Sequence, residues 1–351
     1  MKPVTTSLLA RAACVTLALA VPACSGGGSS SAAVASGNAD GTPAVRIMTG
    51  GLDKQIYLPV MLARELGYYK AQGLDVRFYD EPDGVEAETA MISGQVDAVV
   101  GFYDHTVDLR SKGKSTESVV QLLRAPGEVE MVRTDETGSV KSPADFGGKH
   151  LGVTGLGSST NFLTQYLEEK NGVKASSATS VAVGAGSTFV AAMQNKQIDA
   201  GMTTEPTVSL LERKKLAEPL IDLRTAAGAK ATLGGTYPAS CLYLTTGYVR
   251  KNPEVVQKLV NVYVETLKWI QAHSAAEIAD RMPADYYAGV GKAVYAKALQ
   301  NEKGMYSPDG LMPADGPETV YKVLSAFDPT VKGHPVDLSK TYTDDFVNKA
   351  E

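Results

Sequence analysis

Four short loops, each following an expected strand, carry the polar side chains best suited to bind a small molecule. Ligands of α/β proteins bind beyond the carboxyl ends of parallel strands, where such loops meet. Charged, hydroxyl and aromatic groups there can supply ion pairs, hydrogen bonds and ring stacking. The candidate binding residues are Asp53, Lys54, Gln55, Tyr57, Tyr103, Asp104, His105, Gly157, Ser158, Ser159, Thr160, Glu205 and Tyr237.

The loop at residues 155–160 suits an acidic ligand group. Its glycines let a backbone approach closely, and free N–H groups at the start of the following helix attract an anion. Helix capping by Ser158 or Ser159 is the alternative, and both roles are compatible. A dinucleotide fingerprint is excluded because Thr160 stands where the third glycine would be.

The candidate loops hold more acids than bases. Glu205 in an enclosed cleft would need a partner, either a protein cation such as Lys54 or a donor group on the ligand. Asp53 and Asp104 add negative charge, against Lys54 and His105. Solvation of the loop at Asp53 and Lys54, and a structural role for His105, are the alternatives. We therefore expect a zwitterion or a heteroaromatic with amino groups, not a simple inorganic anion.

The elements that must position these loops alternate between strands and helices, which predicts an α/β protein with mainly parallel sheets. Residues 90–98 and 192–200 echo each other, each reading as a helix end, a polar turn and a strand beginning Val/Ile-Asp-Ala. The echo suits two similarly built lobes, although chance agreement is the alternative. The lobes are expected at residues 44–130 plus 241–351 and at residues 131–240. Residues 128–132 and 242–246 are the expected connections.

Further along the chain, a long helix is expected from Pro253, with Asn252 as its cap. Its apolar side chains recur at helical spacing and predict a buried face. Cys241 lies in an apolar strand pattern and is expected to be a small core residue. The residues of the helical face are Val255, Leu259, Val262, Tyr263, Leu267 and Ile270.

The first 43 residues read as an export signal followed by a tether. Residues 12–21 form an apolar stretch too short to span a bilayer, which is typical of a signal peptide at residues 1–23. Residues 21–24 resemble a bacterial lipobox, which predicts lipidation of Cys24. The alternative is an ordinary secretory signal that contains a cysteine. Residues 24–43 are rich in Gly, Ser and Ala and predict a flexible tether. We expect a membrane-anchored protein of the periplasm or cell surface.

Composition excludes several classes of function. Beyond residue 23 there are 32 basic and 39 acidic residues, a net charge of −7 without a basic run, which argues against nucleic acid. Three cysteines in all exclude a disulfide framework and a cysteine metal cluster. No G-x-S-x-G, H-E-x-x-H or phosphate-loop motif occurs, and the S-x-x-K at Ser111 lacks its partner motifs. We expect a monomer that is not an enzyme and uses no metal or cofactor.

Four stretches in order carry a family resemblance: residues 58–76, 93–98, 142–158 and 197–206. They resemble the nitrate/sulfonate/taurine-type periplasmic solute-binding proteins of ABC importers, a family that includes binders of pyrimidine precursors. The resemblance covers about residues 44–350. It implies a type II periplasmic binding protein, in which each lobe is a mixed, mainly parallel sheet flanked by helices and two hinge strands join the lobes.

The resemblance also implies a function and leaves two alternatives. The protein would capture a small polar organic molecule, sulfonate-, carboxylate- or aminopyrimidine-like, between its lobes and deliver it to a membrane permease. In such proteins the turn corresponding to residues 155–160 receives the ligand's acidic group. One alternative is an enzyme of the same fold acting on a pyrimidine precursor, although the cysteine-rich signature of those relatives has no counterpart here. The other is a lipoprotein that senses a ligand for a membrane receptor.

Overall fold

A computed structural model describes residues 42–174 and 176–350. The predicted signal peptide, the lipidation site Cys24 and all but the last two residues of the predicted tether lie outside the described residues. Within them, no helix combines the length and the apolar character needed to cross a bilayer.

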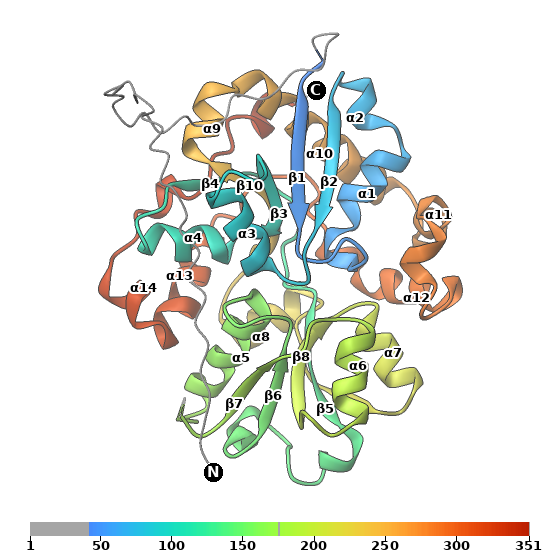
Figure 1. The fold of residues 1–351 in the computed structure, drawn as a ribbon, viewed down its shortest axis with the longest axis vertical. Coiled ribbons are helices and arrows are strands. Elements are labelled where there is room, and N and C mark those ends of the chain that lie inside the picture. The colour runs from blue at the N-terminus through green and yellow to red at the C-terminus, as the bar shows by residue number, and fades with distance from the viewer. Residues whose placement is uncertain (1–41, 175, 351) are drawn as a thin grey trace, which may run out of the picture. The chain divides into compact units, whose positions relative to one another are not determined.

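The first of two five-stranded sheets is mixed, as predicted. Its strand order is β2-β1-β3-β10-β4, in which β1 is parallel to β2 and β3, and β10 is antiparallel to β3 and β4. Helices α1, α2 and α10 pack together beside this sheet, and α3 packs on β1 and β3 (Figure 1). The strands are β1 (Ala44–Thr49), β2 (Asp75–Asp80), β3 (Ala98–Phe102), β4 (Thr116–Gln121) and β10 (Ser240–Thr245). The helices are α1 (Leu58–Glu65), α2 (Tyr68–Ala71), α3 (Gly84–Ile92), α4 (Asp104–Ser111), α9 (Thr246–Lys251) and α10 (Pro253–Ala272).

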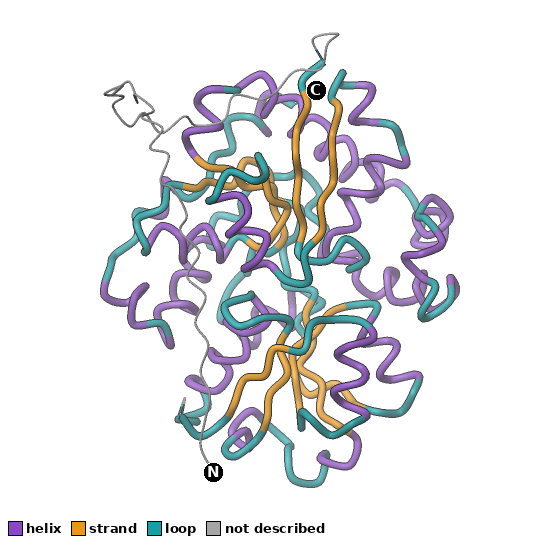
Figure 2. Tube along the Cα trace, in the orientation of Figure 1, coloured by secondary structure: helices purple, strands orange, loops and turns teal. Residues whose placement is uncertain are grey.

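The second sheet repeats this arrangement. Its order is β7-β6-β8-β5-β9, in which β6 is parallel to β7 and β8, and β5 is antiparallel to β8 and β9. Figure 2 shows its strands alternating with helices along the chain. The strands are β5 (Glu128–Arg133), β6 (His150–Val153), β7 (Thr179–Ala182), β8 (Ala200–Thr204) and β9 (Ala217–Asp222). The helices are α5 (Ser159–Lys170), α6 (Ser187–Gln194), α7 (Thr207–Arg213) and α8 (Ala226–Leu233).

The two similar segments, residues 90–98 and 192–200, form the same arrangement in the two sheets. Asp97 precedes β3, and its Oδ2 accepts hydrogen bonds from the backbone N–H of Arg46 at 2.8 Å and from that residue's guanidinium. Asp199 precedes β8, and its Oδ2 accepts the N–H of His150 at 2.9 Å, while Arg133 lies 3.2 Å from its Oδ1. In both sheets a carboxylate therefore fixes the start of the third parallel strand against its neighbour.

The chain passes between the sheets at residues 122–127 and again after α8, at residues 234–239. The boundary expected at residue 130 falls inside β5, which belongs to the second sheet from Glu128 onwards. The C-terminal helices contact both halves: α13 packs on α4 and α5, and α12 packs on α7. These helices are α11 (Ala275–Arg281), α12 (Lys292–Glu302), α13 (Gly316–Phe327) and α14 (Pro329–Gly333).

The long helix α10 begins at Pro253 as predicted, and every residue of its predicted apolar face is buried. Asn252 stands at the expected capping position, but the expected capping hydrogen bond is absent. The Asn252 side chain makes no capping hydrogen bond to α10; its Nδ2 donates instead to the carbonyl of Tyr248 in the preceding helix α9. Cys241 is a buried free thiol in β10, in agreement with its predicted core role.

Candidate functional site

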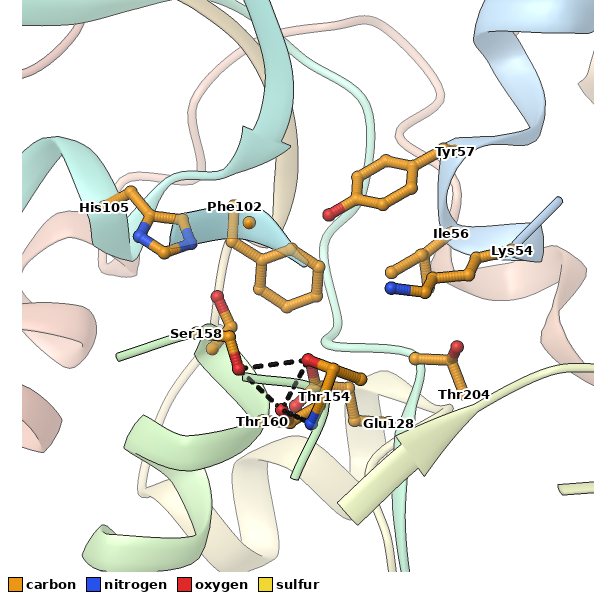
Figure 3. Close-up of a pocket in the computed structure, with 12 residues that line it drawn as sticks. Lys54, Ile56, Tyr57, Phe102, His105, Glu128, Thr154, Ser158, Thr160 and Thr204 are labelled. Carbon is orange, nitrogen blue, oxygen red and sulfur yellow. Dashed lines mark hydrogen bonds between the residues drawn. The ribbon is translucent and has the colours of Figure 1, made fainter. Parts of the chain in front are cut away.

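A small pocket is lined by strand ends and loops of both sheets (Figure 3). Most of its lining residues are polar, and its large apolar or aromatic ones are Ile56, Tyr57 and Phe102. The lining residues are Lys54, Ile56, Tyr57, Gly84, Phe102, His105, Glu128, Thr154, Ser158, Ser159, Thr160 and Thr204.

Strand ends bring these residues together. Phe102 ends β3, Thr154 follows β6 and Thr204 ends β8, so three parallel strands deliver their carboxyl ends to the pocket. Glu128 arrives by a different route. It is the first residue of β5, which runs antiparallel to β8 and pairs Glu128 with Thr204. The amino end of β5 therefore lies at the same edge as the carboxyl end of β8.

Glu128 is a carboxyl with an unpaired oxygen in the pocket. The residue is 1% exposed, and its Oε2 has no hydrogen-bond partner. Burial raises the pKa of Glu128 well above its usual value, and the neighbouring charge of Asp104 adds to the rise, while Lys54 opposes it. Burial therefore shifts Glu128 toward its neutral form, because a carboxylate with little water around it is costly.

Lys54 is a buried amine held by backbone oxygens. Its Nζ donates hydrogen bonds to the carbonyls of Gly50 and, at 3.1 Å, Pro82. Burial lowers the pKa of Lys54, and nearby carboxylates, first among them Asp53, oppose that shift. With two protons committed to carbonyls, the ammonium has one N–H left for another acceptor.

The His105 side chain lines the pocket next to Gly84. Its Nδ1 lies 3.0 Å from Oε2 of Glu88, although the two atoms are not aligned for a directed hydrogen bond. Burial alone would lower the pKa of His105, but the Glu88 carboxylate raises it to about 9. A Cβ at Gly84 would lie 2.6 Å from Nε2 of the imidazole, so the glycine makes room for the ring.

Asp104 lies behind the pocket and connects its two sides. The carboxylate accepts hydrogen bonds from the Ser159 hydroxyl of α5 and from the Tyr237 hydroxyl, both at 2.8 Å. Burial raises the pKa of Asp104, and the charge of His105 opposes the rise. Tyr237 is fully buried, so its hydroxyl orients Asp104 and its ring does not line the pocket.

The hydroxyl groups of the loop at residues 155–160 mostly bond to one another. The Thr154, Ser158 and Thr160 oxygens form a triangle with distances of 2.8 to 3.0 Å. Ser158 is the residue before α5, yet its hydroxyl donates to the Gly155 carbonyl, and it makes no capping hydrogen bond. The alternative capping role of Ser158 is therefore wrong.

The glycines of this loop are expected to let the backbone approach a ligand closely. In the structure, Gly155 lies close to another part of the protein instead. A Cβ at Gly155 would lie 1.9 Å from Oδ2 of Asp83, the residue that caps α3. Gly157 has a φ of 89°, a conformation that suits glycine, and its N–H donates to Asn161 Oδ1 at 2.9 Å. It does not line the pocket.

Glu205 has a different partner from the one expected. Its carboxylate pairs with Arg224 at 2.9 Å, with no ion pair to Lys54. It lies in a second groove, between α7 and α12, together with Ser209 and Asn301. Its backbone oxygen accepts the N–H of Gln55 at 3.1 Å, which ties the two halves together at the pocket's edge.

Three more of the predicted residues lie outside the pocket. Asp53 is exposed, the Gln55 amide donates to the Tyr295 carbonyl at 3.0 Å, and the Tyr103 hydroxyl bonds to Thr341. Six of the predicted binding residues line the pocket, and six further lining residues are not among those predicted. The predicted residues in the lining are Lys54, Tyr57, His105, Ser158, Ser159 and Thr160, and the others are Ile56, Gly84, Phe102, Glu128, Thr154 and Thr204.

One signal in the sequence could have identified Glu128. It alternates with Glu130 in the otherwise apolar run Glu128–Val132, the expected connection between the lobes. Acids are almost never fully buried without a partner, so two of them in an apolar strand mark it as unusual. Across the described ranges 42–174 and 176–350, no group of three or more His, Cys, Asp and Glu residues is placed to hold a metal ion.

Comparison with known families gives a direct match. The sequence model described as NMT1/THI5 like matches residues 55–276, well over half of the chain. The chain belongs to the NMT1/THI5-like family. A curated relative, the 4-amino-5-hydroxymethyl-2-methylpyrimidine phosphate synthase THI11 of Saccharomyces cerevisiae, is 26% identical over 225 residues, which are 62% of this chain. The match spans 64% of the length of that relative.

Solved structures confirm the periplasmic binding protein fold for this NMT1/THI5-like protein. A protein of Bordetella bronchiseptica RB50 has 38% identity and a TM-score of 0.83, covering 87% of this chain and 96% of its own. The ligand-binding component of an ABC-type import system from Staphylococcus aureus has 15% identity and a TM-score of 0.67, covering 88% and 99%. The alkanesulfonate-binding protein SsuA from Xanthomonas axonopodis has 17% identity and a TM-score of 0.67, covering 86% and 98%. The predicted fold class and family resemblance are thus confirmed.

Proposed function

We propose that this chain is the solute-binding component of an ABC importer, which captures a small polar organic molecule between its lobes and is not an enzyme. The observation that carries the proposal is the pocket itself, because His105 from one side and Ser159 from the other line the same space. Closure of two lobes around a ligand excludes water and couples binding to a change of shape. The import role named for the Staphylococcus aureus neighbour supports the proposal.

The proposed setting is the periplasm or cell surface, with Cys24 lipidated and residues 24–43 acting as a tether to the membrane. A permease in that membrane would accept the closed, loaded form. Anchoring would keep the binder close to its permease and raise its effective concentration there. Mass spectrometry of the protein from the membrane fraction tests the anchor, since a diacyl or triacyl mass should be found on Cys24.

The binding role predicts retention and closure. We expect native mass spectrometry of the purified protein to show a small non-covalent mass that is lost on denaturation. After the ligand is removed by unfolding and refolding, adding it back should lower the radius of gyration measured by X-ray scattering. An unchanged radius of gyration in the presence of a bound ligand would contradict the proposal.

The name of the yeast relative favours a second candidate, a pyrimidine synthase. The same mass spectra separate the two functions. A binder releases the molecule that it captured, unchanged after hours of incubation. A synthase would release a product of different mass, and repeated turnover would show as product in excess of protein.

A further inference from the structure

The carboxyl of Asp104 is shared between the two halves of the protein. Asp104 begins α4, which packs on β3 and β4 of the first sheet (Figure 1). Its Oδ1 accepts a hydrogen bond from the hydroxyl of Ser159 at 2.8 Å, and Ser159 begins α5, which packs on β6 and β8 of the second sheet. Its Oδ2 accepts the hydroxyl of Tyr237, in the connection at residues 234–239, also at 2.8 Å. One carboxyl therefore joins both halves and a segment that links them.

All three partners are shielded from water. Asp104 and Tyr237 are 0% exposed, and Ser159 is 5% exposed. When the halves separate, water can replace each hydrogen bond that is lost. When they meet, water is excluded and Asp104 is the acceptor for both hydroxyls. Since a buried hydroxyl without an acceptor is costly, the carboxyl stabilises the closed arrangement more than an open one.

Other contacts between the halves also form without a ligand. The rings of His105 on α4 and Phe162 on α5 lie 5.8 Å apart. The loop after β6 rests on the start of α3, where a Cβ at Gly155 would lie only 1.9 Å from Oδ2 of Asp83. These contacts are made by protein atoms alone, so closure does not require a ligand to supply them.

Resting on the proposed function, we propose that Asp104 is a positioning residue for closure, whose hydrogen bond to Ser159 draws α5 onto α4, so that the two halves close transiently in the ligand-free protein. Binding then holds a form that the protein already visits. Asp104 does not line the pocket, whereas Ser159 does. The carboxyl therefore acts through Ser159 and not on the ligand.

A pair of introduced cysteines can report closure without a ligand. A Cβ at Gly157, in the second half, would lie 4.0 Å from the Cβ of Val85 on α3, in the first half. A disulfide needs a Cβ separation of about 3.5–4.5 Å, so this interlobe pair, Val85→Cys/Gly157→Cys, can form one only when the halves meet. Gly184→Cys/Thr188→Cys is the matched control pair. Its Cβ separation is 3.8 Å, its glycine also has a positive φ, and both positions lie in the second half.

Oxidation of the refolded, ligand-free protein by oxidised glutathione measures how often the halves meet. Alkylation and mass spectrometry follow the loss of two free thiols, and the native cysteines are common to all variants. The rate of the interlobe pair divided by that of the control pair gives the fraction of time spent closed. We expect a ratio above about 0.001, the lower end of the usual populations of minor states.

Loss of the shared carboxyl should slow oxidation of the interlobe pair and leave the control pair unchanged. We expect Ser159→Ala and Asp104→Ala each to lower the interlobe rate at least tenfold. Asp104→Asn should lower it less, because its amide oxygen can still accept one hydroxyl. Thr164→Val is the matched control on α5, since the Thr164 hydroxyl donates to Glu130 Oε2 at 3.2 Å within the second half. That variant should keep the wild-type interlobe rate.

Three results would overturn the inference. The first is a ratio below about 0.001 in the ligand-free protein. The second is a wild-type interlobe rate in both Ser159→Ala and Asp104→Ala. The third is an equal slowing of the control pair, which would show general damage to the fold. Interlobe oxidation that requires a bound molecule would overturn ligand-free closure and leave the importer role standing, because that role is tested separately by the fall in radius of gyration on binding.

Discussion

His105 is a buried imidazole among carboxylates. Its Nδ1 lies 3.0 Å from Glu88, and Asp104 and Asp108 also raise its pKa, which reaches about 9 against the usual 6.5. The charged form therefore persists in the folded protein over a range in which the unfolded chain has lost the proton. The stabilisation is complete below pH 6.5 and is lost as pH rises through 9.

We expect the free energy of unfolding to fall between pH 6.5 and 9, and to fall less in Glu88→Gln, which lacks the carboxylate that holds the proton. Urea denaturation at several pH values measures both slopes. Glu130, whose pKa burial raises to about 8, titrates in the same range in both proteins, so the difference between slopes is the relevant quantity. Glu65→Gln, at an exposed pair with Arg64, is the control. Equal slopes in wild type and Glu88→Gln would refute the assignment.

At this scale the sequence predicts residue types better than residue partners. Lys54 and His105 were expected in the pocket because loops after strands carry binding groups, and both line it. Glu205 is expected to need either a protein cation or a donor group on the ligand, and its partner in the structure is the cation Arg224, 19 positions away. Nothing in local spacing distinguishes Arg224 from Lys54, because the choice depends on how β9 is placed beside β5.

Among the elements, β6 and β8 approach each other unusually closely. A Cβ at Gly201 of β8 would lie 2.5 Å from the carbonyl oxygen of Gly152 in β6. Both residues are glycines, and they pair directly in the sheet. The missing side chain at Gly201 therefore leaves room for the pairing of β6 and β8, the strands that deliver Thr154 and Thr204 to the pocket.

Gly201→Ala should therefore force β6 and β8 apart and lower the free energy of unfolding by about 1–3 kcal/mol, the usual cost of overpacking. Gly247→Ala is the matched control, since a Cβ there meets nothing within 4 Å in helix α9. That change should be neutral or stabilising by up to about 1 kcal/mol. Thermal and urea unfolding compare the two, and equal stabilities would show that the strands can adjust at no cost.

Alternating strands and helices were predictable because periodicity and glycine or proline boundaries are local signals. The echo of residues 90–98 and 192–200 correctly indicated two sheets of like construction. The position of β5 and β10 was not predictable in the same way. Each is a central strand that enters its sheet antiparallel to its neighbours, and that pairing is decided by contacts distant in the sequence. Glu128 was missed for this reason.

For the whole molecule, contacts away from the pocket help to hold its two halves together. The rings of Phe162 on α5 and Phe327 on α13 lie 5.9 Å apart, and α13 also packs on α4. The pocket is formed only when the halves meet, so this contact biases the protein toward the binding form without touching a ligand.

Phe327→Ala should shift the ligand-free protein toward more open forms. We expect X-ray scattering to give a larger radius of gyration than for wild type, because the lost ring contact favoured the closed arrangement. Lys322→Ala, at an exposed position on the same helix, should leave the radius unchanged. A radius of gyration equal in all three proteins would show that α13 has no part in closure.

The placement of β10 has a consequence for biosynthesis. All strands of the second sheet lie between residues 128 and 222, so a ribosome releases that half as one uninterrupted piece. The first sheet has β10 between β3 and β4, and β10 ends only at Thr245. Strands β1 to β4 are therefore made early but lack a central member until the other half has been translated. The half that comes second in the chain can fold first, and the amino-terminal half must wait in an incomplete, exposed form.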